Sequence, residues 1–112
     1  MDIKNKIENE VEYSVHLHPE YEGPEGHFDT GDDEEDARIC AQIREDAEWN
    51  EWAWCTVEVR ATWNGVFGNA FLGACSYASE KDFKEDGYFE DMKNQALEAL
   101  CAKLEKLQIR EE

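Results

Sequence analysis

Two histidines one residue apart and a nearby acidic run are the features of this sequence that could bind a metal ion. His16 and His18 form an H-x-H pair, and His27 and Asp29 follow in the next stretch of the chain. Alternate residues of a strand point the same way, so both imidazoles could reach one ion. Two histidines on the solvent face of an edge strand have the same spacing, and this second interpretation predicts no metal.

The stretch DTGDDEED, residues 29–36, is rich in the oxygen ligands that calcium prefers. An EF-hand loop has acids at its first, third and fifth positions, glycine at the sixth and glutamate at the twelfth. Counting from Asp29, the third position is Gly31 and the sixth is Glu34, so the pattern fails. We therefore predict no metal site and no cofactor.

Nucleophilic catalysis finds little support in the sequence. There is no G-x-S-x-G motif and no glycine-rich phosphate loop. The four cysteines, at positions 40, 55, 75 and 101, form no C-x-x-C pair, and the three histidines all lie within residues 16–27. We therefore predict a protein that is not an enzyme and has no catalytic residues, with reduced cysteines that fill the core.

One strand and one helix are expected in the first half of the chain. Residues 11–17 alternate between apolar and polar side chains, which predicts a half-buried strand followed by a loop. From residue 33 to about 50, apolar residues recur every three or four positions, which predicts an amphipathic helix. Asp32 with Glu35 fits a capping box at its start, and Thr30 is the alternative cap. Residues 1–10 show no clear period, and we expect them to be weakly ordered.

The clearest local signal is the Asn-Gly pair at 64–65, between two runs of strand-forming residues. This dipeptide favours a two-residue hairpin turn, which sets the pairing of the two strands. The predicted register places Trp63 opposite Val66 and extends to Cys55 opposite Ala74. It also puts three large aromatic side chains together on the second face of the hairpin: Trp54, Phe67 and Phe71.

A second amphipathic helix is predicted over residues 88–108, after a polar connection with room for one helical turn. The expected order of elements is β-α-β-β-α. The simplest architecture is a two-layer α+β domain over residues 11–112, with a small, mostly antiparallel sheet and two helices on one face. The first strand could join either edge of the hairpin, and the sequence does not decide between them.

Charge is the most unusual property of the chain. It has 28 acidic and 11 basic residues, a net charge of −17, and residues 1–36 alone carry −11. This charge repels nucleic acid and anionic membranes and attracts basic protein surfaces. No apolar run approaches the ~18 residues of a membrane span, and the first ten residues do not resemble a secretory signal. We therefore expect a cytoplasmic protein.

Acids cluster in TGDDEED, in residues 20–25 and in KEDGYFEDM at the start of the second predicted helix. Together with the short length, the lack of catalytic motifs and the predicted fold, they resemble small acidic inhibitor proteins of phages and mobile elements, of the anti-CRISPR and antirestriction type. The stretch TWNGVFGNAFLGACSYASEKDF, followed by GYFEDMKNQAL, also resembles uncharacterised phage proteins. The resemblance implies a non-enzymatic mimic of nucleic acid that occupies a basic surface of a host defence complex inside a bacterial cell.

Nine acids and three aromatic residues are predicted to contact this partner. They are Asp29, Asp32, Asp33, Glu34, Glu35, Asp36, Asp86, Glu90, Asp91, Trp54, Phe67 and Phe71. The acids would supply phosphate-like charge, and the aromatic residues would supply desolvated anchors. The alternative is a protein–protein interaction or assembly module, a homodimer included, that uses the aromatic sheet face. High salt should weaken the first kind of contact and spare the second.

Overall fold

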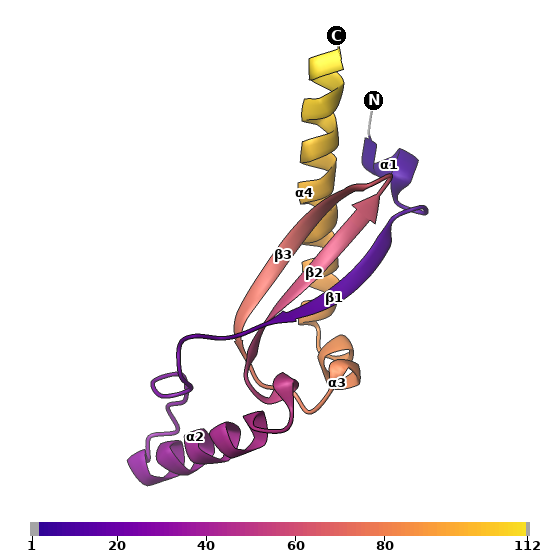
Figure 1. The fold of residues 1–112 in the computed structure, drawn as a ribbon. Coiled ribbons are helices and arrows are strands. Elements are labelled where there is room, and N and C mark those ends of the chain that lie inside the picture. The colour runs from indigo at the N-terminus through magenta and orange to yellow at the C-terminus, as the bar shows by residue number, and fades with distance from the viewer. Residues whose placement is uncertain (1–2, 112) are drawn as a thin grey trace.

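The computed structural model describes the backbone of residues 3–111 and the side chains of residues 3–107. The molecule is elongated, with extents of 61 × 22 × 21 Å (Figure 1). Its radius of gyration is 17.7 Å, whereas a compact domain of this length has about 13 Å. The reason is that one helix, α2 (Asp33–Ala47), lies beyond one end of the sheet, while the last helix, α4 (Tyr88–Glu111), extends past the other end.

The sheet has three antiparallel strands in the order β1-β2-β3. They are β1 (Glu12–His18), β2 (Cys55–Trp63) and β3 (Val66–Cys75). β1 pairs with β2, so β2 is central, which resolves the choice of edge that the sequence leaves open. Asn64 and Gly65 both have positive φ, 50° and 79°, as the predicted hairpin turn requires.

The hairpin register is confirmed from Trp63 opposite Val66 as far as Val57 opposite Leu72. The next predicted pair is wrong, because Cys55 lies opposite Cys75 and not opposite Ala74. A β-bulge between Cys55 and Val57 shifts the register here, and Ala74 has a positive φ of 54°. A bulge adds one residue to a strand and increases its twist.

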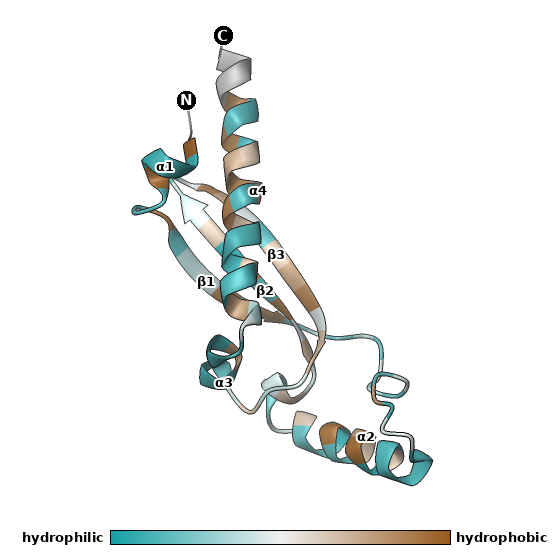
Figure 2. Ribbon diagram, turned by 180° about the vertical axis from the view of Figure 1, so that it is seen from behind, coloured by the Kyte–Doolittle hydropathy of each residue, from teal (hydrophilic) through white to brown (hydrophobic). Residues whose placement is uncertain are grey.

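The α+β class is confirmed, although the helices are arranged differently from the expectation. α4 (Tyr88–Glu111) packs on β2 and β3 and covers one face of the sheet (Figure 2). α2 instead packs mainly on the short 3-10 helix η1 (Glu51–Ala53). Only Cys40 and Ile43 of α2 are buried, so its apolar stripe is too narrow to hold it on the sheet. α3 (Glu80–Glu85) leads into α4 and supplies the turn expected there.

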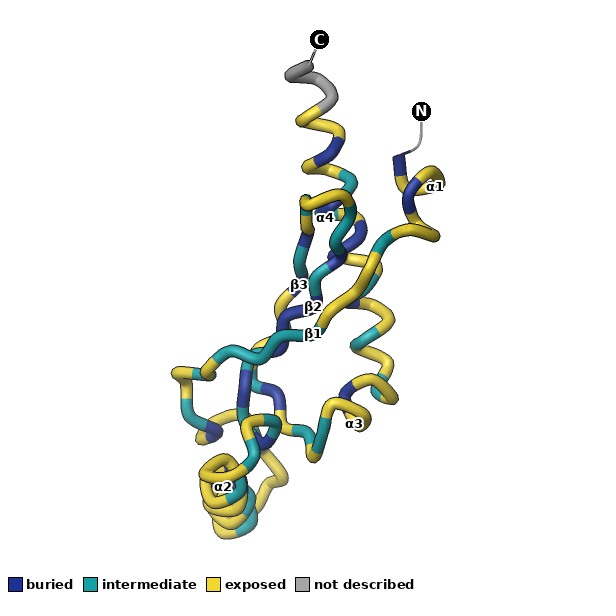
Figure 3. The backbone as a smooth tube through the Cα atoms, turned by 45° about the vertical axis from the view of Figure 1, so that its right-hand side comes forward, coloured by how far each residue is buried: buried dark blue, intermediate teal, exposed yellow. Residues whose placement is uncertain are grey.

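The core lies between α4 and the sheet (Figure 3). Val57, Val59 and Ala61 of β2 are completely buried, and so is Leu100 of α4. Gly68 of β3 allows this close approach, since a Cβ atom there would lie 2.2 Å from the backbone nitrogen of Leu100. The small residues of β3 thus bring the helix backbone into direct contact with the sheet.

A short helix that the sequence did not indicate, α1 (Ile3–Ile7), lies beside the C-terminal half of α4. Ile3 and Ile7 are both buried, 5% and 4% exposed. Weak order is the expectation for residues 1–10; of these, Met1 and Asp2 lie outside the described residues, and α1 packs on the core through Ile3 and Ile7. Together with Trp63 and Leu107, α1 lines a groove of about 530 Å³ at the hairpin end.

Candidate binding surfaces

The segment between β1 and β2, residues 19–54, forms a separate acidic unit at one end of the molecule (Figure 1). It consists of a loop, α2, η1 and Trp54. The unit has thirteen acids and two arginines, so it carries a charge of −11 out of the −17 of the whole chain. This concentration of charge in one projecting part of the fold is the main electrostatic feature of the protein.

Three acids of the unit hold the start of α2 together. Asp32 is the N-cap, and its Oδ1 accepts hydrogen bonds from the backbone amides of Glu34 at 3.0 Å and Glu35 at 3.4 Å. Asp36 accepts from both the amide and the hydroxyl of Thr30, at 3.0 and 2.9 Å. Asp29 accepts from the amide of Gly31 at 3.2 Å in the preceding loop. The predicted cap at Asp32 is therefore confirmed over the alternative at Thr30. The reciprocal half of the predicted capping box is not formed, because the amide of Asp32 donates to Thr30 Oγ1 at 3.4 Å and the carboxylate of Glu35 pairs with Arg38.

The two arginines of the unit are already paired. Arg44 donates two hydrogen bonds, both of 2.7 Å, to the carboxylate of Glu25. Arg38 forms an ion pair with Glu35, and its hydrogen bonds lower the pKa of that carboxyl group. All of these groups lie at the surface. The remaining acids of the unit are therefore not paired with either of its arginines.

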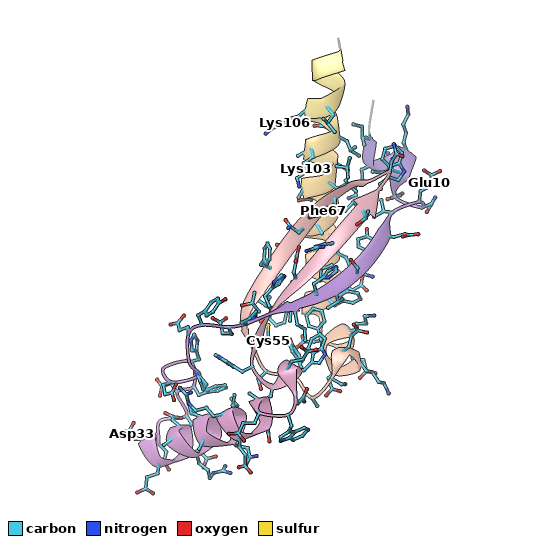
Figure 4. The ribbon with its side chains drawn as sticks, in the orientation of Figure 1. Glu10, Asp33, Cys55, Phe67, Lys103 and Lys106 are labelled. Carbon is cyan, nitrogen blue, oxygen red and sulfur yellow. The ribbon has the colours of Figure 1, made fainter. Side chains whose placement is uncertain are left out.

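Asp33 and Glu34 are the most available acids of the run. Both are exposed, and neither side chain has a hydrogen bond or ion pair within the described residues. Figure 4 shows Asp33 at the outer end of α2, pointing away from the rest of the molecule. These two side chains are free to meet a partner without disturbing the helix cap.

The other end of α2 is also acidic, with Glu45, Asp46 and Glu48 in or next to its last turn. The C-terminus of a helix carries a partial negative charge, so acids there are unfavourable for the helix. Capping and the helix dipole explain why acids are favourable at the start of α2. The dipole makes acids at its end unfavourable. Helix stability alone therefore does not account for the acidity of the unit.

Trp54 lies just before β2, and within the described residues its contacts are with the acidic unit and not with Phe67 or Phe71, so the three predicted aromatic residues do not form one cluster. It precedes the bulge and faces the loop of the acidic unit, where its Nε1 donates to the backbone oxygen of Glu22 at 2.8 Å. Its ring makes an edge contact with His27, with 5.5 Å between centroids. Trp54 therefore anchors the acidic unit to the start of β2.

Glu20 provides a second link between the unit and the sheet. Its Oε2 accepts from the backbone amide of Ala74 at 2.8 Å and from the hydroxyl of Thr56 at 3.0 Å. The hydrogen bond from Ala74 is the main cause that lowers the pKa of Glu20. The residue that the bulge places in the left-handed region thus offers its amide to this carboxylate.

The predicted acids Asp86, Glu90 and Asp91 are not part of the acidic unit. They lie at the junction of α3 and α4, whereas α2 lies beyond the end of the sheet. Asp86 accepts a hydrogen bond from the hydroxyl of Tyr77 at 3.0 Å. Glu90 pairs with Lys93 at 2.9 Å. The structure therefore divides the predicted acids between two places.

The face of the sheet opposite α4, which we call the open sheet face, carries Phe67 and Phe71, 38% and 58% exposed. Beneath them lies Glu58, whose side chain is only 2% exposed. Arg60 stacks over the ring of Phe67, with 4.9 Å between its guanidinium carbon and the ring centroid. His18 lies against Phe71, with 5.9 Å between ring centroids. This face combines exposed aromatic rings with a fixed charged network.

Glu58 is the centre of that network. It accepts from Arg60 Nε at 2.7 Å, from His18 Nε2 at 2.6 Å and from Asn69 Nδ2 at 3.0 Å. Burial by itself would raise the pKa of Glu58, but these hydrogen bonds outweigh it and lower the pKa to about 2. These residues were not predicted as a site. The predicted register could have indicated the pair of Glu58 and Arg60, because it places both residues on one face of the hairpin.

The three histidines have separate partners. His16 contacts the hydroxyl of Ser14 at 2.8 Å, His18 contacts Glu58, and His27 lies 3.6 Å from a carboxylate oxygen of Glu22. Within the described residues, no three side chains of the types that bind metals converge on one point. The two histidines of the H-x-H pair thus lie on the open sheet face, in the edge strand β1.

Comparison with protein-family models, with curated protein sequences and with solved structures found no match to this chain. In the part of the chain that the structure describes, no helix is both long enough and apolar enough to cross a membrane.

Proposed function

We propose that this chain is a non-enzymatic binding protein whose acidic unit occupies a basic, nucleic-acid-binding surface of another protein. The partner we have in mind is a host defence complex in the bacterial cytoplasm, as the resemblance to phage inhibitors implies. The observation that carries the proposal is the charge of −11 on residues 19–54, where the two arginines are already paired. This end of the molecule presents a high density of negative charge, which attracts a basic cleft.

The linear density of charge on α2 is comparable to that of a nucleic-acid strand. Residues 32–48 include eight acids, over a helix length of about 25 Å, or one acid per ~3 Å. One strand of DNA has a phosphate per ~3.4 Å of axis. The acids form two clusters, residues 32–36 and 45–48, whose centres are about 19 Å apart along the helix. We expect a partner with two basic patches at a similar separation.

Two exposed aromatic residues of the acidic unit add contacts that charge alone does not supply. Tyr21 is 93% exposed and Trp49 is 75% exposed, and both flank the acids. Exposed tyrosine and tryptophan side chains often contribute most of the free energy of binding at protein interfaces. These two residues, which were not among the predicted contacts, are better anchors for the acidic unit than Trp54, whose ring is held by the loop.

The test uses charge reversal at the two unpartnered acids, Asp33→Lys with Glu34→Lys. The immobilised protein captures basic proteins from a bacterial lysate at low salt, and a 30-base-pair duplex DNA is then added as competitor. We expect the DNA to release the captured proteins and the double variant to capture at least about tenfold less, since two reversals change the charge by four. Glu98→Lys with Glu105→Lys makes the same change of charge on α4, outside the unit, and should capture nearly as well as the wild type.

Capture that ignores both the DNA competitor and the Asp33/Glu34 reversal would contradict the proposal. So would an equal loss in the α4 control, because the effect would then come from net charge and not from the acidic unit. Circular dichroism of both variants establishes that α2 is intact. Asp32 is left unchanged on purpose, because its side chain caps the helix.

A second candidate function is association through the open sheet face, favoured by the exposure of Phe71. Large exposed aromatic residues on one sheet face mark a surface for protein contact. In this case Phe71→Ala should remove the association, and salt should have little effect. The response to salt and to these two sets of variants separates the two candidates.

A further inference from the structure

The outer edge of β1 has backbone groups without a partner. The two-residue turn makes Trp63 and Val66 a hydrogen-bonded pair, and such pairs alternate along antiparallel strands. The even-numbered residues of β2 therefore bond toward β1, where they face the even-numbered residues 12–18. It follows that Tyr13, Val15 and Leu17 direct their N–H and C=O groups outward. No hydrogen bond from outside the sheet reaches them within the described residues.

The outer edge of β3 differs, because it is protected at two places. Lys103 Nζ donates to the backbone oxygen of Phe67 at 2.7 Å, and Figure 4 shows this lysine projecting from α4. Past the bulge, Glu20 accepts the amide of Ala74. Lysines and bulges are common means of preventing a sheet edge from pairing with another chain. At β1, Lys93 of α4 lies over the ring of Tyr13, 5.6 Å from its centroid, but no lysine bonds to the strand backbone within the described residues. The pairing of β1 with β2 is regular from Glu12 to His18.

We propose that β1 pairs with β1 of a second copy of this chain, antiparallel, around a two-fold axis at Val15. In this register Val15 lies opposite itself and Tyr13 lies opposite Leu17. All three are residues whose backbone groups point outward, as a hydrogen-bonded pair requires. The register uses all seven residues of β1, and the two sheets become one continuous sheet of six strands.

The side chains of β1 are complementary in this register. On the open sheet face, the exposed carboxylate of Glu12 lies opposite His18 of the second copy, and Ser14 lies opposite His16. On the other face, Tyr13, which is 37% exposed, lies opposite the half-buried Leu17. A carboxylate opposite an imidazole, which can donate a hydrogen bond, and apolar side chains opposite each other both favour pairing.

Charge repulsion between the two chains is small in this arrangement. β1 contains one acid and two histidines, so the paired edges are nearly neutral. Antiparallel pairing also directs the two acidic units to opposite ends of the dimer. The contact is isologous and therefore closed, which limits the assembly to two copies. A single strand pair is a small interface, so we expect dissociation constants in the range of about 10 µM to 1 mM.

The first test is sedimentation equilibrium over that concentration range, with Val15→Pro and Val15→Ala as matched variants. Alanine shortens the side chain but keeps the outward N–H, whereas proline removes that N–H and is tolerated on an edge strand. We expect the wild type and Val15→Ala to dimerise and Val15→Pro to remain monomeric, with equal circular dichroism. A wild type that stays monomeric throughout, equal dimerisation of the two variants, or species larger than a dimer would overturn the proposal.

A second test covers the case in which Val15→Pro does not fold. Val15→Cys places two thiols across the axis at a Cα separation of about 5.5 Å, which suits a disulfide. Tyr13→Cys would place its two thiols about 13 Å apart, because four residues separate them. Mild oxidation should therefore cross-link Val15→Cys and not Tyr13→Cys, and equal yields in the two variants would contradict the register.

Salt makes this proposal independent of the proposed function. Two chains of charge −17 repel each other, so added salt should strengthen the dimer. The same salt should weaken the binding of the acidic unit to a basic partner. A dimer that weakens with added salt would be inconsistent with pairing at the neutral edge of β1.

Discussion

Replacing Glu58 by glutamine should destabilise the protein in a manner that depends on pH. Glu58 is buried at the centre of the open sheet face and accepts hydrogen bonds from Arg60, His18 and Asn69. Burial opposes the ionised form, and the three donors more than compensate. Glutamine keeps the shape of the side chain, but it is neutral and turns one acceptor into a donor that faces other donors.

The magnitude follows from the pKa of Glu58, which is lowered from 4.5 to about 2. Each pKa unit corresponds to 1.36 kcal/mol, so the ionised carboxylate contributes about 3 kcal/mol to the free energy of unfolding at pH 7. A lowered pKa stabilises the folded state above the unfolded value. The contribution is therefore complete above pH 4.5, decreases by about 1.4 kcal/mol per pH unit below it, and is lost near pH 2.

Urea unfolding followed by tryptophan fluorescence measures this directly. We expect Glu58→Gln to lose about 3 kcal/mol at pH 7 relative to the wild type and to approach the wild type as the pH falls toward 2. Comparing the two proteins at each pH cancels the general effect of the large negative charge. Glu34→Gln is the matched control, since Glu34 is exposed and unpartnered, and it should change stability by less than about 0.5 kcal/mol.

Two results would refute this account of Glu58. One is a Glu58→Gln variant within about 0.5 kcal/mol of the wild type at pH 7, which would mean that the three hydrogen bonds contribute no net stability. The other is a difference that stays constant between pH 7 and pH 3. A constant difference would show that Glu58 acts by packing and not through its charge.

Two further changes test the packing of α4 and the capping of α2. Gly68→Ala should lower the free energy of unfolding by about 3 kcal/mol or more, because the new Cβ would lie 2.2 Å from the backbone nitrogen of Leu100. Gly87→Ala is the control, since open space surrounds Gly87, and it should leave the thermal midpoint nearly unchanged. Equal midpoints for the two variants would count against the close contact. Asp32→Ala should lower the stability of α2 by about 1 kcal/mol and speed the hydrogen exchange of its first-turn amides. Asp33→Ala should do neither. Similar exchange in the two variants would rule out Asp32 as the cap.

Local rules were enough to predict most of the hairpin and the two long helices. Asn-Gly at 64–65 sets the register through the geometry of its turn, and the spacing of apolar residues locates α2 and α4. The bulge lies in β3, where Gly73 and Ala74 both fall between the pairs Val57–Leu72 and Cys55–Cys75, and Gly73 is a local signal for it, since a glycine inside a strand often marks a bulge. α1 is instead a product of tertiary contact, since a helix of five residues is stable only because Ile3 and Ile7 are buried against the core.

The candidate surfaces were harder to predict for a similar reason. The acids of residues 29–36 are found together because they are adjacent in sequence, whereas those near Asp86 are placed elsewhere by the path of the chain. Alternation along β2 predicts the side of the strand on which Trp54 lies, but it does not show that the loop of the acidic unit packs against its ring. The pairing of Glu58 with His18 joins residues forty positions apart, and it becomes visible only once β1 is known to lie beside β2.

The connection between β1 and β2 has a consequence for how this fold can change. His18 and Thr56 lie opposite each other in adjacent strands, so residues 19–55 are, in topological terms, the loop of a hairpin. Closing a loop of 37 residues instead of a four-residue loop costs only about 2 kcal/mol, because the entropy of closure grows with the logarithm of length. The sheet and α4 can therefore keep their structure while the inserted segment, residues 19–55, is replaced by another sequence. Replacement of that segment would change what the molecule binds without altering the register of the strands.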